Sequence, residues 1–284
     1  MKQKKAALMV SIFIAPIVLI IFTIGSCKSK SLDELIFRGD FETRDASQWK
    51  ALHCNDSEQF SIVSSPTREG KYAAKLSVSN HDKFQDMSGE RCDLLRPNHD
   101  EKEGDEYWYA WSTFFPKNWQ SPKDWFVIAD WHSRYQDVCQ LVQIEVTEKN
   151  ALIAKVLTGN VSGYQCFDGS GSAFTTEQTI TPQLDLSTWN DFIIHVKWTT
   201  KPTGFIEIFY NNEEKGSFKK VVSLKGIPTL QYQEDINNPL RPYFKLAHYR
   251  SDKNTHTSTL FHDGFRQGKT QESIVVDNLY KLSD

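Results

Sequence analysis

The chain has 284 residues, of which 39% are hydrophobic, 13% aromatic and 24% charged, and its formal net charge is −3. This balance excludes a disordered tail, a collagen and a coiled coil. Residues 6–24 form the one long apolar run, which excludes a multi-pass membrane protein, and the remaining chain is long enough for one large domain.

The N-terminal segment is typical of an exported lipoprotein. Three lysines precede the apolar run, and Ile24-Gly-Ser-Cys follows it. A basic segment, an apolar segment and small residues before a cleavage site describe a secretory signal. A cysteine directly after the small residues resembles the lipobox of bacterial lipoproteins. We therefore expect residues 1–26 to be a signal peptide and Cys27 to carry a lipid at the bacterial cell envelope, on the outer membrane or the cell surface. A membrane anchor or a plain signal peptide is the alternative, and the latter would leave the protein periplasmic or secreted.

The charge of the exported chain limits its partners. Loss of the three lysines in residues 1–26 lowers the formal net charge of −3 by three, to −6. A mildly acidic chain without a basic tract is not expected to bind nucleic acid. We expect a monomer that contacts a membrane only through its N-terminal lipid.

Four further cysteines follow Cys27, namely Cys54, Cys92, Cys139 and Cys166. An even number in an oxidising compartment predicts two disulfides, and three connectivities are open. Free buried thiols are the alternative. None of these residues belongs to a Cys-x-x-Cys pair, so a zinc site is not expected.

The rest of the chain predicts an all-β fold. Residues 27–38 read as a tether and residues 39–284 as one domain, because no repeat or linker divides them. Alternating apolar residues predict strands at 60–63, 71–78, 107–115, 126–131, 141–146, 192–198, 205–210 and 273–280. Asn211-Asn212 is expected to close a hairpin. Many short strands without a helical stripe favour a β-sandwich or jelly roll.

An acidic run at residues 99–106 has two interpretations. Carboxylate oxygens suit calcium, but the spacing does not match an EF-hand loop. A solvated loop is therefore the preferred interpretation.

Polar residues are expected to share one face of several strands, because side chains at i and i+2 point the same way. In residues 243–249 this face holds Tyr243, Lys245, Ala247 and Tyr249. The same rule joins Arg91 with Asp93, Asp130 and His132 with Ile128, and Gln143 with Glu145. If these strands are neighbours, the polar faces form one groove. Singly, each residue has a simpler structural explanation, such as a surface ion pair for Arg91 and Asp93.

Five stretches resemble the signature segments of heparin lyase I-like polysaccharide lyases, from Gly39 to the C-terminus. They are Gly39-Asp-Phe-Glu-Thr, Pro66-Thr-Arg-Glu-Gly-Lys-Tyr-Ala-Ala-Lys, Gly89-Glu-Arg-Cys-Asp-Leu, Trp125-Phe-Val-Ile-Ala-Asp-Trp-His and Tyr243-Phe-Lys-Leu-Ala-His-Tyr-Arg. Three of them are also similar to the Arg-x-Glu-Leu, Gln-x-His and Tyr-Phe-Lys-Ala-Gly-x-Tyr motifs of jelly-roll alginate lyases.

The resemblance implies a jelly roll, a concanavalin-like β-sandwich, whose concave groove binds an acidic polysaccharide and cleaves it by β-elimination. By matched position His132 is the base and Tyr249 the acid, or both acid and base, while Arg91 and Lys245 hold the uronate carboxylate. Tyr243 is a further substrate-binding candidate. The sequence requires no cofactor, although some family members use calcium.

Two positions depart from the family pattern. Asp130 stands where the family usually has Gln, and Ala247 replaces a Gly. A carboxylate cannot neutralise a substrate carboxylate unless it is protonated or holds a metal. Asp130 is instead expected to hydrogen-bond His132 and raise the pKa of its imidazole. Gln143 is the candidate for the missing amide.

Two other functions remain open at this point. A glycoside hydrolase needs two carboxyls on one face, and the nearest pair, Glu145 and Glu148, falls on opposite faces of a regular strand. A non-catalytic carbohydrate-binding module would use surface aromatics such as Trp108, Trp119 and Trp125. The polysaccharide itself is left open, since heparin-like chains, glucuronan and alginate all carry the required carboxylate.

Overall fold

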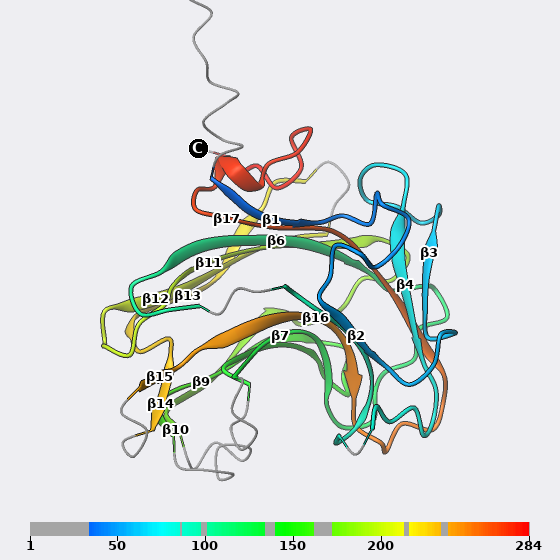
Figure 1. The fold of residues 1–284 in the computed structure, drawn as a ribbon, viewed down its shortest axis with the longest axis horizontal. Helices are drawn as coiled ribbons and strands as arrows, with labels where there is room; N and C mark the ends of the chain where they lie inside the picture. Colours follow the sequence, from blue (N-terminus) through cyan, green and yellow to red (C-terminus); the bar gives the residue numbers. More distant parts are fainter. Residues whose placement is uncertain are drawn as a thin grey trace, which may run out of the picture.

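The computed structural model describes residues 34–85, 87–97, 101–133, 140–161, 172–212, 216–233 and 238–283. The expected signal peptide, Cys27, Cys139 and Cys166 lie outside these residues. The described chain forms two β-sheets packed face to face (Figure 1). It contains no helix with the length and hydrophobicity that a bilayer span requires. The expected β-sandwich is confirmed.

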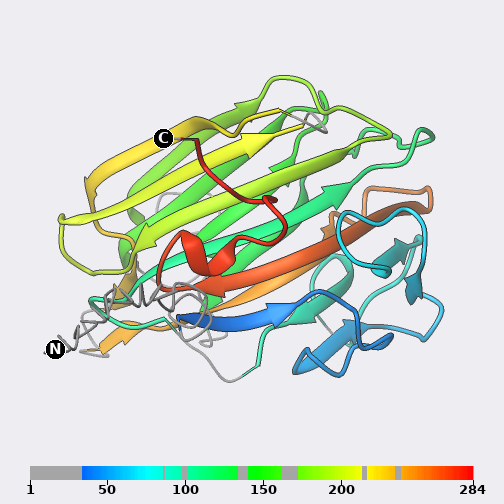
Figure 2. The same ribbon diagram turned by 90° about the horizontal axis from the view of Figure 1, so that it is seen from above.

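One layer is an eight-stranded antiparallel sheet. Its order is β13 (Lys219–Ile227), β12 (Gly204–Asn211), β11 (Trp189–Lys197), β6 (Glu106–Phe114), β17 (Ser258–Gly268), β4 (Ala73–Val78) and β3 (Phe60–Val63), with β1 (Leu35–Gly39) also paired to β17. Figure 2 shows the C-terminal segment lying across the outer face of this sheet.

The other layer is a nine-stranded sheet. Its order is β15 (Asn238–Leu240), β14 (Gln231–Gln233), β9 (Leu152–Val161), β8 (Val142–Val146), β7 (Phe126–Ser133), β16 (Pro242–Arg250), β5 (Glu90–Leu95) and β2 (Ala51–Cys54), with β10 (Ser172–Thr181) also paired to β9. The sheet is arched, and its outer face lies on the hollow side of the arch (Figure 1). Of its central strands, β7 and β8 follow one another in the chain, whereas β5 and β16 come from distant parts of it.

Large aromatic side chains fill the space between the sheets. Trp111 stacks on Phe192 in the eight-stranded sheet, with ring centroids 4.9 Å apart. Trp131 and Phe244 of the other sheet meet edge to face at 4.9 Å, and both side chains are fully buried. Buried aromatic pairs supply both apolar area and a preferred geometry. The core therefore fixes the inward residues of β7 and β16, and their alternate residues point outward.

The strand expected at residues 273–280 is wrong. The segment forms a short 3-10 turn, η2 (Glu272–Ile274), and then a turn that Val276 and Leu279 close. Its alternating pattern reflects burial of Ile274 and Tyr280 on the outer face of the eight-stranded sheet. Positive φ angles at Asp277, Asn278 and Tyr280 interrupt any extended backbone.

The hairpin after β12 exists, but its connection is longer than the expected two-residue turn. The last paired residues are Tyr210 and Lys219. Strands such as β10, β13 and β17 were not predicted from the sequence. Polar residues and glycine interrupt the hydrophobic alternation in these strands.

A disulfide joins Cys54 of β2 to Cys92 of β5, which confirms one of the two expected disulfides and decides a connectivity that the sequence left open. The solvated-loop interpretation of residues 99–106 is wrong for Glu101. That carboxylate is fully buried, accepts a hydrogen bond of 2.7 Å from the Tyr109 hydroxyl and pairs with Arg96 at 3.3 Å. No group of three or more His, Cys, Asp or Glu side chains suited to a metal occurs among the described residues.

Candidate active site

The outer face of the nine-stranded sheet collects most of the residues expected from the sequence. β16 points four side chains outward, namely Tyr243, Lys245, Ala247 and Tyr249. The intervening Phe244 and Leu246 belong to the core. The alternation rule therefore placed the two phenols and the cation on one surface correctly.

Strand register brings residues from distant segments to this surface. Asp130 of β7 lies opposite Gln143 of β8 on one side and Lys245 of β16 on the other. His132 lies opposite Tyr243, and Tyr249 lies opposite Arg91 of β5. Directly opposed residues have Cβ atoms about 4.5–5.5 Å apart. All seven substrate and catalytic candidates thus lie on one face of four adjacent strands, with His132 and Tyr243 towards one end of β16 and Arg91 and Tyr249 towards the other.

A β-bulge in β7 corrects one expectation. Ile128 was expected to share the face of Asp130 and His132, but Ile128 and Ala129 both lie in the core. The register between β7 and β8 shifts between Val127 and Ala129, which is the position of the extra residue. A bulge inserts one residue and reverses the facing of the strand beyond it. Val127 consequently points outward, and beyond the bulge so do Asp130 and His132.

The Tyr249 side chain is held from several sides. Its hydroxyl lies 3.0 Å from the Ser88 hydroxyl, and the Arg91 guanidinium lies over its ring at 3.9 Å from the centroid. The Trp125 ring is 4.4 Å away. Gly89 has a φ of +66°, and a Cβ there would lie 2.6 Å from the Tyr249 ring. Only a glycine allows the chain to pass so close to this phenol.

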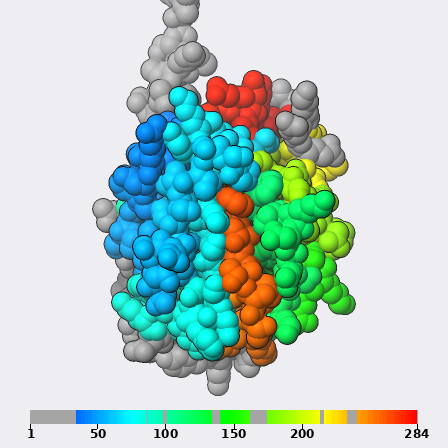
Figure 3. All heavy atoms as spheres, turned by 90° about the vertical axis from the view of Figure 1, so that its right-hand side faces the viewer, coloured from blue at the N-terminus to red at the C-terminus, as the bar shows by residue number. Residues whose placement is uncertain are grey.

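The chain beyond Tyr249 is anchored between the segments that carry Ser88 and Trp125. Figure 3 shows this end of the molecule, where the chain after β16 (orange) lies between a cyan and a green segment. The Ser251 amide donates a 3.1 Å hydrogen bond to the Trp125 carbonyl, and Lys253 pairs with Asp124 at 2.9 Å. These contacts keep Trp125 beside Tyr249.

Protein groups already surround Arg91. The guanidinium donates a hydrogen bond to the Ser88 carbonyl, and its Nη1 lies 3.6 Å from the Asp93 carboxylate. Its face covers the Tyr249 ring, and the side chain is almost fully buried. Arg91 therefore positions Tyr249 and Ser88 directly, whatever it contributes to substrate binding.

Lys245 is buried between two carboxylates. Its Nζ lies 3.7 Å from Asp93, and Asp130 faces it from β7. Burial lowers the pKa of Lys245, but Asp130 and Asp93 outweigh that effect and leave the pKa above its ordinary value. The ammonium group is consequently charged at neutral pH.

Asp130 is the most unusual group on this face. The side chain is 1% exposed, and neither carboxylate oxygen has a hydrogen-bond partner among the described residues. Burial raises the pKa of Asp130 to about 6, against the opposing effect of Lys245. The sequence-based expectation of a hydrogen bond from Asp130 to His132 is therefore wrong. A buried carboxyl without partners favours the neutral, protonated form.

His132 carries its proton on a defined nitrogen. Nδ1 lies 2.6 Å from the Ser133 carbonyl oxygen, which can only accept, so Nδ1 carries the hydrogen and Nε2 has the lone pair. Burial, and then Lys245, lower the pKa of His132 to about 3. The imidazole is thus neutral across the physiological range.

Two neighbouring residues, His53 and Ser88, were missed as site candidates, and a third, Glu145, was expected only as a polar residue of the groove and as one member of a hydrolase pair. His53 of β2 lies opposite Asp93, and burial lowers its pKa to about 4. Glu145 lies in the same face, and burial raises its pKa to about 7. Ser88 precedes β5 in a loop without strand periodicity, so the sequence carries no signal for it. The sequence carried only a weak signal for His53. Alternation along the strand predicts that its side chain points to the face opposite that of Cys54.

The residues proposed for the two other functions do not assemble. Glu148 follows the end of β8 and accepts a 2.7 Å hydrogen bond from the Asp124 amide. Trp108 stacks on His195 in the eight-stranded sheet, whereas Trp119 is buried against Phe115. Trp125 alone adjoins the site, so the three tryptophans form no common platform for a sugar.

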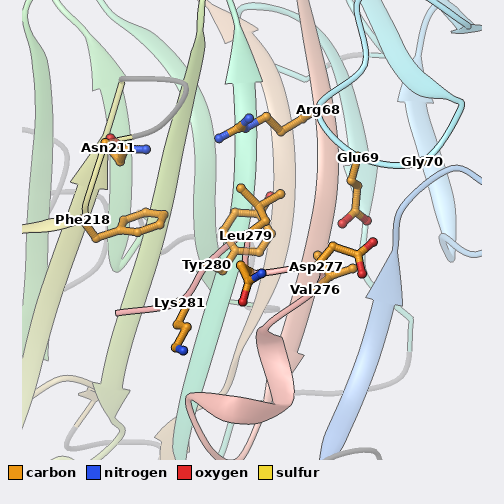
Figure 4. A pocket seen from close by; sticks show the side chains of 12 residues that line it. Arg68, Glu69, Gly70, Asn211, Phe218, Val276, Asp277, Leu279, Tyr280 and Lys281 are labelled. Carbon is orange, nitrogen blue, oxygen red and sulfur yellow. The ribbon is translucent and has the colours of Figure 1, made fainter. Parts of the chain in front are cut away.

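A cavity of about 460 Å³ lies elsewhere, beneath the C-terminal segment (Figure 4). Arg68, Phe218 and Tyr280 are among its lining residues. The Arg68 guanidinium is paired with Asp191 at 2.7 Å, and the Tyr280 hydroxyl lies 2.9 Å from Ser112. Its polar groups thus support the fold, and none of the expected site residues lies there.

Comparison with protein families gives one match. A family model described as polysaccharide lyase matches residues 41–266, which include every described site residue. A search of curated protein sequences finds no match to the chain. The narrower heparin lyase I-like assignment stays a prediction.

Solved structures share the architecture at low sequence identity. An endo-β-1,4-glucuronan lyase from the fungus Trichoderma reesei is 13% identical, with a TM-score of 0.64 over 83% of this chain and 96% of that one. An alginate lyase from a Chlorella virus is 15% identical, with a TM-score of 0.52 over 83% and 100%. A β-glucanase catalytic domain from Podospora anserina is 8% identical, with a TM-score of 0.54 over 83% and 96%. The shared fold alone does not separate lyase from glucanase chemistry.

Proposed function

This chain belongs to the polysaccharide lyase family, and from that premise we propose that it cleaves a uronic-acid-containing polysaccharide by β-elimination. The observation that carries the proposal is that a neutral His132, the charged Lys245 and the phenol of Tyr249 lie on the same face of the sheet. In the reaction a base removes the proton beside the uronate carboxylate, and the glycosidic C–O bond breaks. The leaving oxygen takes up a proton, and a carbon–carbon double bond remains in the uronate.

The first requirement is stabilisation of negative charge. The proton lies on a carbon next to a carboxylate, so its removal places charge on that carboxylate. A preorganised cation or hydrogen-bond donor there is usually the largest catalytic contribution. Lys245, the Gln143 amide and the protonated form of Asp130 lie in one row across three strands. In this proposal the three groups hold the uronate carboxylate.

The second requirement is proton transfer on both sides of the bond. His132 offers the Nε2 lone pair, and an incoming uronate carboxylate raises its low pKa by adding a negative charge. Tyr249 donates its phenolic proton to the leaving oxygen and recovers one through the Ser88 hydroxyl, 3.0 Å away. Arg91, stacked on the ring, keeps the phenol in place.

Two structural neighbours support a uronate as the reacting sugar, because one is a glucuronan lyase and another an alginate lyase. No step of this proposal requires calcium, and the use of calcium by some family members stays an untested expectation for this chain. An extracellular polymer agrees with an exported, lipid-anchored enzyme. Changing Cys27 to Ser should then release the protein from the membrane fraction.

The test is a screen of the purified protein against uronate polysaccharides. We expect new ends that absorb in the ultraviolet, because elimination conjugates the new double bond with the carboxylate. New reducing ends without that absorbance would indicate hydrolysis instead. Tyr249→Phe serves as the matched control for a contaminating lyase, since it should remove the absorbance while the protein stays folded.

A further inference from the structure

The outer face of the nine-stranded sheet is not basic. Its described strands from β10 to β5 carry three cations on this face, namely Arg91, Lys155 and Lys245. They also carry four carboxyl groups on it, namely Asp93, Asp130, Glu145 and Glu177. Arg241 is exposed immediately before β16, and counting it as well would give four cations and four carboxyl groups. The two histidines add no charge near neutral pH, because their pKa values are lowered to about 4 and about 3.

The cations of this face are also engaged locally. Arg91 and Lys245 share the single carboxylate of Asp93, at 3.6 Å and 3.7 Å. Lys155 lies directly opposite Glu177 on the neighbouring strand. When Asp130 carries a proton, the positive charge of Lys245 can neutralise one substrate carboxylate. Further carboxylates along the face would meet no additional cation on these strands.

The flanks of the catalytic row offer uncharged surface instead. On one side Thr175 and Thr179 are exposed on β10, whose charged Glu177 is already opposite Lys155. On the other side the Trp125 ring packs beside Tyr249. Hydroxyls and an aromatic ring are groups that contact neutral sugars through hydrogen bonds and apolar faces.

From this charge pattern we infer that the substrate is a polysaccharide whose reacting uronate is flanked by uncharged sugars, not a polyuronate or a sulfated chain. The inference rests on the proposed lyase function and specifies its substrate class. A polyuronate would lay a carboxylate on every sugar over a face whose three cations each already lie beside or opposite an aspartate or glutamate side chain. Like charges placed together cost binding energy and select against that partner.

The test compares polymers that differ in charge density. Unsulfated chondroitin and chondroitin sulfate share a backbone in which every second sugar is a uronate, so they differ only in sulfate. Polyglucuronate carries a carboxylate on every sugar. We expect kcat/KM on unsulfated chondroitin to exceed that on the other two by about tenfold or more at low salt. Added salt should narrow the gap through screening. A preference for polyglucuronate or chondroitin sulfate at low salt would overturn the inference while leaving the lyase proposal intact.

A binding measurement separates the inference from the proposed function. If no polymer yields an unsaturated end, the lyase proposal fails, and the affinities of the full chain for the same polymers still decide the charge question. Tighter binding of polyglucuronate than of unsulfated chondroitin at low salt would count against the inference.

A variant pair localises the effect. Glu177→Gln removes an exposed negative charge from the outer face of β10, and Glu272→Gln removes one from η2 on the opposite side of the molecule. Glu177→Gln should raise kcat/KM on polyglucuronate several-fold more than on unsulfated chondroitin, and Glu272→Gln should change neither. Equal effects of the two variants would mean that the charges of this face do not select the substrate.

Discussion

Asp130 and Lys245 face each other directly across β7 and β16, with 1% and 3% of their surfaces exposed. Asp93 approaches the same ammonium group to 3.7 Å from β5. A cation between two ionised carboxylates has no positive charge left for a third. The proton on Asp130 therefore decides how much positive charge the site offers to a uronate.

The first prediction concerns pH. Below its pKa of about 6, Asp130 is protonated and donates to the substrate carboxylate, whereas above that pH it is ionised and repels the carboxylate. We expect kcat/KM to fall by about tenfold for each pH unit above that value. Asp130→Asn keeps the shape and removes the titration, so its pH–rate profile should lack this alkaline decline. The groups that face Asp130, Lys245 and Gln143, are unchanged in the variant. An identical decline in both proteins would assign it to another group.

The second prediction concerns Tyr249. Tyr249→Phe removes one hydroxyl and keeps the ring on which the Arg91 guanidinium stacks, so the packing should be preserved. We expect kcat to fall by about 10²-fold or more, the scale of general acid–base catalysis, with little loss of polysaccharide binding. Steady-state kinetics and an independent binding assay measure the two effects. Tyr243→Phe, on the same strand face, is the matched control and should reduce kcat far less.

The third prediction concerns Gly89, which contributes no side chain to the chemistry. A Cβ at this position would lie 2.6 Å from the Tyr249 ring and 2.6 Å from the Arg250 carbonyl oxygen, at a φ of +66°. Gly89→Ala should therefore destabilise the fold by about 1–3 kcal/mol and displace the phenol. Urea unfolding and kcat should both respond. Gly104→Ala is the control, because its φ is also positive but a Cβ there meets no atom within 4 Å. Loss of kcat in Gly104→Ala as well would contradict the role given to Gly89.

The fourth prediction concerns the disulfides. The Cys54–Cys92 bond ties the edge strand β2 to β5, which carries Arg91 and Asp93. Replacing both cysteines with alanine should lower the free energy of unfolding by about 2–4 kcal/mol. The remaining pair, Cys139 and Cys166, is predicted to form the second bond. Mass spectrometry of exported protein alkylated without reduction should find neither thiol modified, and two modified thiols would show that this second bond does not form.

Much of the site followed from local sequence alone. The period of two along a strand is a property of the extended backbone, so alternation placed Tyr243, Lys245 and Tyr249 on one face before any neighbour was known. The same rule paired Arg91 with Asp93. It failed at Ile128, because a bulge adds one residue without leaving a mark in the hydrophobic pattern.

Only the tertiary structure decided which faces meet. β5, β16 and β7 are adjacent in the sheet but far apart in the chain, and their order depends on packing between residues that no local pattern connects. That order put Asp130 beside Lys245, His53 opposite Asp93 and the Ser88 hydroxyl next to that of Tyr249. It also turned residues 273–280 from a predicted strand into a segment packed on the opposite sheet. The alternation of a strand is encoded residue by residue, whereas strand order and register depend on the free energy of the whole packed core.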